Sequence, residues 1–128
     1  MLQKWKHKLE KFDSLSIKEQ EHVVGRTKEE SIELEGERQK KDSHVTRTDL
    51  KKDGKGLKIW RRSYPYGNLR DHGLMYLAFS TDLERLDMQL SSMVGANDGV
   101  NDKLMNFSTA VSGSYYFCPP LELLEGLK

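Results

Sequence analysis

Hydrophobic residues near the N-terminus recur at helical spacing. They lie three or four positions apart and are Leu2, Trp5, Leu9 and Phe12. Most of the residues between them are lysine, glutamate or glutamine. This pattern predicts an amphipathic helix over residues 2–12.

A second helix is indicated by its capping residues. Ser16 is followed three positions later by Glu19, the arrangement of a capping box. The pattern predicts a helix that runs to about Val24 and ends at Gly25 in the left-handed conformation. Residues 35–43 contain no apolar side chain and predict a loop.

The second half of the chain carries most of the strand-like patterns. Alternation predicts a strand over residues 57–61, which Pro65-Tyr66-Gly67 breaks. An almost continuous apolar run predicts a buried strand over 73–79. A second capping box opens a helix over 81–93, and a last strand is predicted over 111–117. Helices followed by strand, strand, helix and strand indicate an α+β fold, in which helices cover one face of an antiparallel sheet.

Composition narrows the class of protein. The 128 residues suit one domain, and 21 basic against 20 acidic residues give a net charge of +1, which argues against a nucleic-acid-binding surface. No apolar run is long enough to span a membrane, and the first residues lack a signal-peptide core. The single cysteine, Cys118, excludes an internal disulfide and a multi-cysteine zinc site. We therefore expect a cytoplasmic protein.

Four histidines are candidates for metal or acid–base chemistry. His7 and His22 lie in polar stretches predicted to be helical, so we expect both to be solvated. His72 follows Asp71 in a turn. His44 lies at the end of the polar loop and before a short apolar patch, where it is either a surface residue or a metal ligand.

Two further residues have both a structural and a functional interpretation. Strand alternation places Ile59, Arg61 and Ser63 on one face, so Arg61 either enters solvent at the strand end or holds its guanidinium in a pocket. Asp102 precedes one predicted helical turn over residues 102–107. It is either an N-cap or a carboxylate that orients a metal-bound imidazole.

An ordered set of short motifs resembles the C-terminal half of the dye-decolorizing-type (DyP-type) haem peroxidases, over roughly residues 20–120. The matching residues are Gly25-Arg26-Thr27-Lys28; Ser43-His44-Val45 with Arg47; Arg61-Arg62-Ser63-Tyr64-Pro65-Tyr66-Gly67; Gly73-Leu74; Asp102-Lys103-Leu104 with Phe107; and Ser112-Gly113-Ser114 with Phe117 and Pro119.

The resemblance implies a fold, a cofactor and a set of roles. The fold would be a ferredoxin-like antiparallel sheet with helices on one face, one half of a dimeric α+β barrel-type peroxidase. The cofactor would be haem b, with His44 as the proximal iron ligand and Asp102 bonded to its other ring nitrogen. Arg61 would be the distal catalytic arginine. The resemblance also places Ser63, Tyr76 and Arg26 in the haem pocket.

The implied reaction is oxidation of dyes and phenolic donors by hydrogen peroxide through a ferryl intermediate. The family's distal aspartate lies in a Gly-x-x-Asp-Gly motif within its N-terminal half, which residues 1–128 do not match. The similar string Gly95-Ala96-Asn97-Asp98-Gly99 follows the histidine, and we interpret it as turn residues.

These observations leave three hypotheses. The chain is a single domain equivalent to the haem-binding half without its N-terminal half, and it either acts as a peroxidase or is a catalytically impaired haem-binding or haem-handling (deferrochelatase-like) fragment. The third hypothesis is a degenerate fragment or an interaction domain without a cofactor. For the first two, we expect peroxide and small aromatic molecules as partners, with no nucleic acid and no membrane. A missing sister half also predicts a homo-oligomer or pairing with that half.

Overall fold

An antiparallel sheet forms the centre of the structure, a computed structural model that describes residues 1–127. Its central strands are β6 (His72–Phe79) and β1 (Leu2–His7), and β7 (Ser108–Ser114) pairs with β1 at one edge. The other edge is divided, because β4 (Trp60–Arg61) and β5 (Tyr64–Gly67) pair in succession with β6. All of these pairings are antiparallel.

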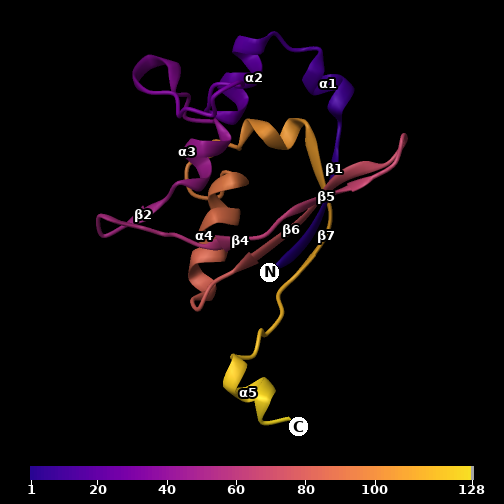
Figure 1. The fold of residues 1–128 in the computed structure, drawn as a ribbon. Coiled ribbons are helices and arrows are strands. Elements are labelled where there is room, and N and C mark those ends of the chain that lie inside the picture. The colour runs from indigo at the N-terminus through magenta and orange to yellow at the C-terminus, as the bar shows by residue number, and fades with distance from the viewer. Residues whose placement is uncertain (128) are drawn as a thin grey trace.

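The remaining elements are helices, short turns and a hairpin. The helices are α1 (Leu9–Asp13), α2 (Ile17–Val24), α3 (His44–Thr48), α4 (Leu83–Met93) and α5 (Leu121–Glu125). Two 3-10 turns, η1 (Gly36–Arg38) and η2 (Lys103–Asn106), and a small hairpin of β2 (Lys51–Lys52) and β3 (Lys55–Gly56) complete the elements. Helices α3 and α4 lie on the same side of the sheet, and α5 projects away from the other elements (Figure 1). Within residues 1–127, no helix combines the length and apolar character needed to cross a membrane.

The strand register decides which side chains face the helices. Trp5 lies opposite Leu74, and Gln3 lies opposite Tyr76. Directly opposed residues of neighbouring strands point to the same face, and these four line a cavity beneath the helices. The residues between them, such as Lys4, point to the other face.

The end of α2 fixes the start of α3. Gly25 closes α2 with a φ of +92°. A Cβ at this position would lie 2.9 Å from Ser43 Oγ and 2.9 Å from the Cβ of Val45, so only glycine permits this approach. Ser43 is completely buried and is the N-cap of α3. The residue that follows it is His44.

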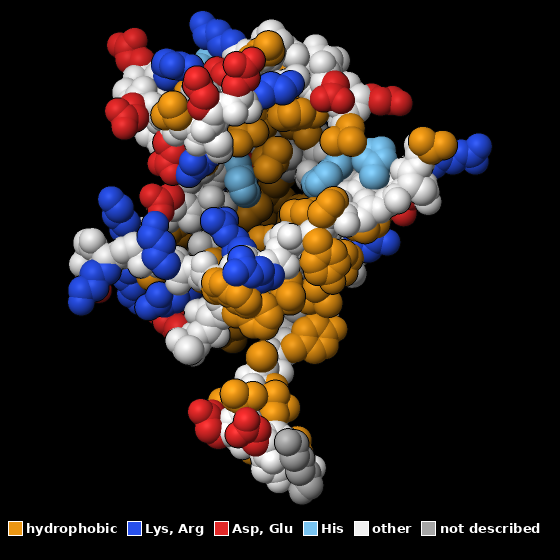
Figure 2. All heavy atoms as spheres, viewed as in Figure 1, with side chains coloured by type: hydrophobic (Ala, Val, Ile, Leu, Met, Phe, Trp, Pro, Cys, Tyr) orange, Lys and Arg blue, Asp and Glu red, His pale blue; other side chains and the backbone are white. Residues whose placement is uncertain are grey.

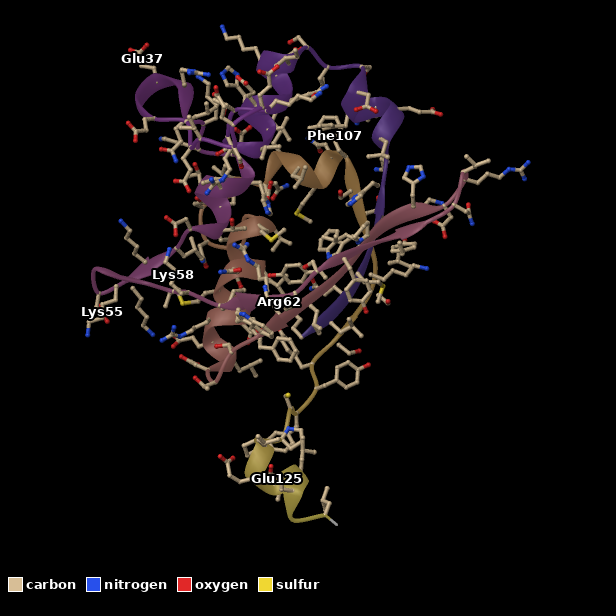
Figure 3. The ribbon with its side chains drawn as sticks, in the orientation of Figure 1. Glu37, Lys55, Lys58, Arg62, Phe107 and Glu125 are labelled. Carbon is tan, nitrogen blue, oxygen red and sulfur yellow. The ribbon has the colours of Figure 1, made fainter. Side chains whose placement is uncertain are left out.

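The core is small and lies where the helices meet the sheet. Its buried hydrophobic residues are Val23, Leu34, Ala78, Leu86 and Phe107. Phe107 packs edge-on against Phe12, with 5.4 Å between the ring centres. In Figure 3, Phe107 lies among the elements, whereas Glu37 and Lys55 lie at the periphery.

The helix predicted over residues 2–12 is wrong for its first half. Residues 2–7 form β1, and only Leu9–Asp13 is helical. Trp5 lies between Lys4 and Lys6, which is the alternation of a strand with one buried face. The backbone partners of β1 are β6 and β7, more than sixty residues further along the chain. Helical spacing among nearby residues therefore pointed to the wrong element.

Three strand predictions need smaller corrections. Pro65 does not break the structure but lies within β5, an edge strand, where the missing N–H is tolerated. Of the strand predicted over 57–61, only Trp60–Arg61 is regular. The last strand is Ser108–Ser114 rather than 111–117.

The predictions of α2, β6 and α4 are confirmed in outline. Ser16 and Glu19 form the capping box of α2, and Gly25 is its left-handed cap. The predicted strand over 73–79 and the helix ending at Met93 are present, although Asp82 alone caps that helix. The chain has the α+β architecture with an antiparallel sheet and helices on one face.

Candidate functional site

A cavity of about 320 Å³ lies between the sheet and the helices. One wall is formed by β1, β6 and the divided edge strand, and the other by α3, α4 and η2. Figure 2 shows this hollow among hydrophobic side chains, with histidines at its walls. The apolar lining residues are Met1, Trp5, Leu74, Leu90, Met93, Leu104 and Met105.

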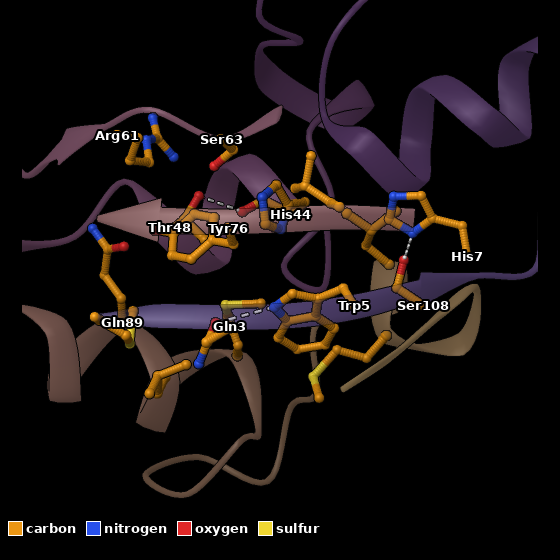
Figure 4. A pocket seen from close by; sticks show the side chains of 16 residues that line it. Gln3, Trp5, His7, His44, Thr48, Arg61, Ser63, Tyr76, Gln89 and Ser108 are labelled. Carbon is orange, nitrogen blue, oxygen red and sulfur yellow. Dashed lines mark hydrogen bonds between the residues drawn. The ribbon is translucent and has the colours of Figure 1, made fainter. Parts of the chain in front are cut away.

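His44 enters the cavity from the first turn of α3. Its Nδ1 lies 2.6 Å from Asp102 Oδ2, and 29% of its side chain is exposed. A carboxylate only accepts hydrogen bonds, so the ring hydrogen is at Nδ1. Among the described residues, Nε2 has no hydrogen-bond partner. In the tautomer with its hydrogen at Nδ1, the lone pair is on Nε2, and His44 is one of the residues that line the cavity (Figure 4).

Asp102 is almost completely buried, with 1% of its surface exposed. One carboxylate oxygen contacts His44, and the other accepts from the backbone N–H of Leu104 at 2.9 Å. Asp102 is thus both the N-cap of η2 and the partner of His44. The two interpretations that the sequence left open are compatible with each other.

Arg61 and Ser63 line the same cavity from the divided edge strand. Within residues 1–127, the Arg61 guanidinium makes no hydrogen bond and no ion pair. Arg62 points elsewhere and packs over the Trp60 ring, 4.5 Å from its centre. The alternation that placed Arg61 and Ser63 on one face agrees with this arrangement.

Tyr76 lines the cavity on β6. Burial raises the pKa of its hydroxyl, and the nearby positive charge of Arg61 partly opposes this effect. The phenol is therefore a neutral hydrogen-bond donor at physiological pH, close to an unpaired guanidinium.

Arg26, which the resemblance placed in the haem pocket, does not line this cavity. Its guanidinium donates to the Ser31 carbonyl at 2.8 Å and pairs with Glu33. The backbone also forms an isolated bridge between Arg26 and Glu33. The chain folds back on itself after α2, so this charge is compensated locally.

Sequence reasoning missed His7. It lies on β1 rather than on a helix, and it lines the cavity with Nδ1 2.7 Å from Ser108 Oγ. Burial lowers the pKa of its imidazole, and His72 lowers it further. The alternation of Trp5 and His7 with Lys4 and Lys6 is the signal that could have identified it.

Asp98 of the glycine-rich string does not line the cavity. Its carboxylate pairs with Arg47, and Gly95 and Gly99 beside it have positive φ values. The interpretation of this string as turn residues agrees with this geometry.

Three comparisons with known proteins agree on one family. The family model described as "Dyp-type peroxidase, C-terminal" matches residues 1–123. The dye-decolorizing peroxidase of Mycolicibacterium paratuberculosis is 34% identical over 128 residues, which are 97% of this chain and 36% of that protein.

Solved structures show the same similarity. A dye-decolorizing protein from V. cholerae has a TM-score of 0.92 and 43% identity, over 98% of this chain and 42% of that one. A variant of DypB from Rhodococcus jostii, in complex with heme, has a TM-score of 0.92 and 34% identity, over 99% of this chain and 42% of that one. The ferredoxin-like α+β fold is thereby confirmed. The chain spans about two fifths of the length of these relatives, and it belongs to the Dyp-type peroxidase family.

Proposed function

We propose that this chain binds haem b through His44 and takes part in the oxidation of dyes, phenols and similar small donors by hydrogen peroxide. The observation that carries the proposal is the 2.6 Å contact between His44 and the buried Asp102 at the cavity wall. Family membership supports the class of reaction. In this proposal, residues 1–128 are a single domain equivalent to the haem-binding C-terminal half of the relatives.

The residues of the cavity fit a haem group. The volume of about 320 Å³ lies within the range of roughly 300–1,000 Å³ that is usual for small-molecule sites. The walls are largely apolar, as a macrocycle requires, and the free Nε2 of His44 is a donor suited to iron. When bound, haem would supply the redox-active iron at which peroxide is reduced and electrons from the donors are collected.

Asp102 would fix the ring of His44. Metal-binding histidines usually donate their second N–H to a carboxylate or a carbonyl, which sets the tautomer and makes the ligating nitrogen more basic. Asp102 is held for this task by the backbone N–H of Leu104. Its negative charge would also stabilise positive charge on the imidazole ring.

Arg61 would act on peroxide. Its guanidinium lines the cavity without a partner in the described chain, so its N–H groups are free to donate to a bound oxygen. A fixed positive charge stabilises the negative charge that develops as the O–O bond breaks. Ser63 and the neutral hydroxyl of Tyr76 would add donors beside it.

A second candidate function rests on one observation. Among the described residues that line the cavity, none is an aspartate or a glutamate. A peroxidase needs a base to move the proton of peroxide, and a carboxylate is a common choice. The alternative is therefore a haem-binding or haem-handling (deferrochelatase-like) protein with impaired turnover.

Titration with hemin tests the binding proposal. We expect a Soret band with the unaltered chain and its loss in His44→Ala. The matched control is His22→Ala, which removes a histidine of α2 that is outside the cavity. An unchanged spectrum in His44→Ala would exclude His44 as the ligand.

Rapid mixing with peroxide separates the two candidate functions. Turnover of a phenolic donor that falls in Arg61→Ala but not in Arg62→Ala supports the peroxidase, because only Arg61 lines the cavity. Stable hemin binding without donor oxidation supports the haem-handling alternative.

We also propose that the sheet face turned away from the cavity is covered by protein. Trp60 and Tyr64 are each 53% exposed, and their strand partners Phe79 and Met75 share that face. Large exposed apolar patches are uncommon on isolated domains. The occupant would be the part of the relatives that residues 1–128 do not match, or a second copy of this chain. Light scattering should show a dimer if the second copy is the occupant.

A further inference from the structure

A second connection joins the two segments that carry His44 and Asp102. His44 and Arg47 lie one turn apart on α3, and Asp98 and Asp102 lie four residues apart in the segment after α4. His44 contacts Asp102, and Arg47 contacts Asp98. The proposed function uses only the first of these two contacts.

Arg47 is an unusually buried cation, with 8% of its surface exposed. Its two terminal nitrogens donate to the Asp98 carboxylate at 2.7 and 3.0 Å. Its Nε donates to the carbonyl of Ser92 at 2.9 Å, and Nη2 donates to the same carbonyl at 2.5 Å. Ser92 is in the last turn of α4, where helix carbonyls carry partial negative charge. We call this arrangement the Arg47–Asp98 clamp.

The Asp98 carboxylate is also held by its own segment of the chain. The backbone N–H of Val100 donates to Asp98 Oδ1 at 3.1 Å. The hydrogen bonds from Arg47 lower the pKa of Asp98, and the Val100 N–H adds to this effect. The carboxylate is therefore ionised near neutral pH and remains a bidentate acceptor for the guanidinium.

The segment between Asp98 and Asp102 connects the Arg47 contact to the carboxylate that faces His44. Gly95 has a φ of +68°, and a Cβ there would lie 2.6 Å from the Asn101 side chain, so the turn is tight. The backbone N–H of Asp102 donates to the Met93 carbonyl at 2.8 Å. The segment is thus attached to α4 at its end and to α3 through Arg47 near its middle. These attachments restrict where the Asp102 carboxylate can lie.

We propose that the Arg47–Asp98 clamp positions Asp102 against His44, and so sets the hydrogen bond that keeps the ring hydrogen at Nδ1 and leaves Nε2 free. Arg47 and Asp98 are positioning residues, since neither lines the cavity. The inference rests on the proposed function only in the assumption that Nε2 binds iron. The hydrogen bond itself is a property of the chain without a cofactor.

Nuclear magnetic resonance of the full chain without hemin tests the clamp. A short N–H···O contact to a carboxylate shifts the imidazole proton far downfield and protects it from exchange with water. We expect this His44 Nδ1 proton signal in the unaltered chain and in Asp98→Glu, which keeps the carboxylate. We expect its loss or rapid exchange in Asp98→Asn and in Asp98→Ala.

Asp98 is 48% exposed at its side chain, so these substitutions leave no buried gap. The matched control is Glu84→Gln, which removes the exposed ion pair with Lys52 and touches neither segment of the site. That control should keep the signal. An unchanged His44 signal in Asp98→Ala, with the Arg47 Nη–H signals shifted to show that the pair is broken, would overturn the proposal.

The result is independent of haem binding. A chain that fails to bind hemin but loses the His44 signal in Asp98→Ala refutes the proposed function and supports the clamp. A chain that binds hemin through His44 and keeps the signal in Asp98→Ala supports the function and refutes the clamp.

Discussion

Replacement of Asp102 should separate the stability of the fold from the affinity for hemin. Asp102 accepts two hydrogen bonds in an almost completely buried position, one from Leu104 N–H and one from His44. Loss of an N-cap costs about 1 kcal/mol, and loss of a hydrogen bond to a charged group costs roughly 1.5–3 kcal/mol. Asp102→Ala should therefore lower the free energy of unfolding by about 3 kcal/mol.

Asp102→Asn should act differently. Its amide oxygen continues to cap η2, so we expect a loss of only about 1 kcal/mol. Its NH₂ group then faces His44 Nδ1, which must become an acceptor. The ring hydrogen moves to Nε2 and occupies the lone pair that iron would need. Changes to the partner of a metal-binding histidine usually cost about 10- to 100-fold in metal affinity, and we expect a loss at the upper end of that range.

Two assays on the same samples test this reasoning. In urea unfolding, the unaltered chain should be the most stable, followed by Asp102→Asn and then Asp102→Ala. In hemin titration, Asp102→Asn should have the lowest affinity of the three. The matched control is Asp82→Asn, because Asp82 is also an N-cap but lies outside the cavity. Asp102→Asn with unaltered hemin affinity would refute the role assigned to the carboxylate.

Two further predictions concern the fold around the site. Gly25→Ala should lower the free energy of thermal unfolding by about 2 kcal/mol, because the added Cβ meets Ser43 and Val45 at positive φ. The control Gly54→Ala, also at positive φ but in open space, should lower it by only about 1 kcal/mol. Equal losses in the two variants would contradict the packing argument. Tyr115 donates to Asp87 at 2.5 Å, and burial followed by this hydrogen bond raises its pKa to about 12. Its stabilising effect is complete below the pKa of the unfolded state, about 10, and is lost as pH rises through 12. Between pH 9 and about 12, the free energy of urea unfolding should therefore fall more steeply in the unaltered chain than in Tyr115→Phe. Parallel curves of unfolding free energy against pH would contradict this role of Tyr115.

Local patterns predicted the elements whose partners lie nearby in the sequence. The capping box at Ser16 and the apolar stripe up to Met93 are complete within their own helices, and both were predicted. β1 was missed because its hydrogen-bond partners lie far along the chain. Without those partners, the helical spacing of its apolar residues was the stronger local signal.

The candidate site shows the same limit. His44 and Asp102 are 58 residues apart, and neither their types nor their spacing indicates contact. The family resemblance supplied that pair, together with Arg61, Ser63 and Tyr76. It also supplied Arg26, whose charge is compensated locally by Glu33. The alternation around His7 was a local signal, but it was outweighed by the helical spacing of the apolar residues. The Arg47–Asp98 clamp depends on the folding of distant segments against one another, so no local pattern revealed it.

Chemical rescue tests most directly whether His44 is the iron ligand. His7 is the rival, because it lines the same cavity and burial lowers the pKa of its imidazole, which keeps the ring neutral and able to coordinate a metal. We expect His44→Gly to lose the hemin spectrum of the unaltered chain and added imidazole to restore it, whereas His7→Gly keeps the spectrum without imidazole. Loss of the spectrum in His7→Gly, with an unchanged spectrum in His44→Gly, would contradict the account.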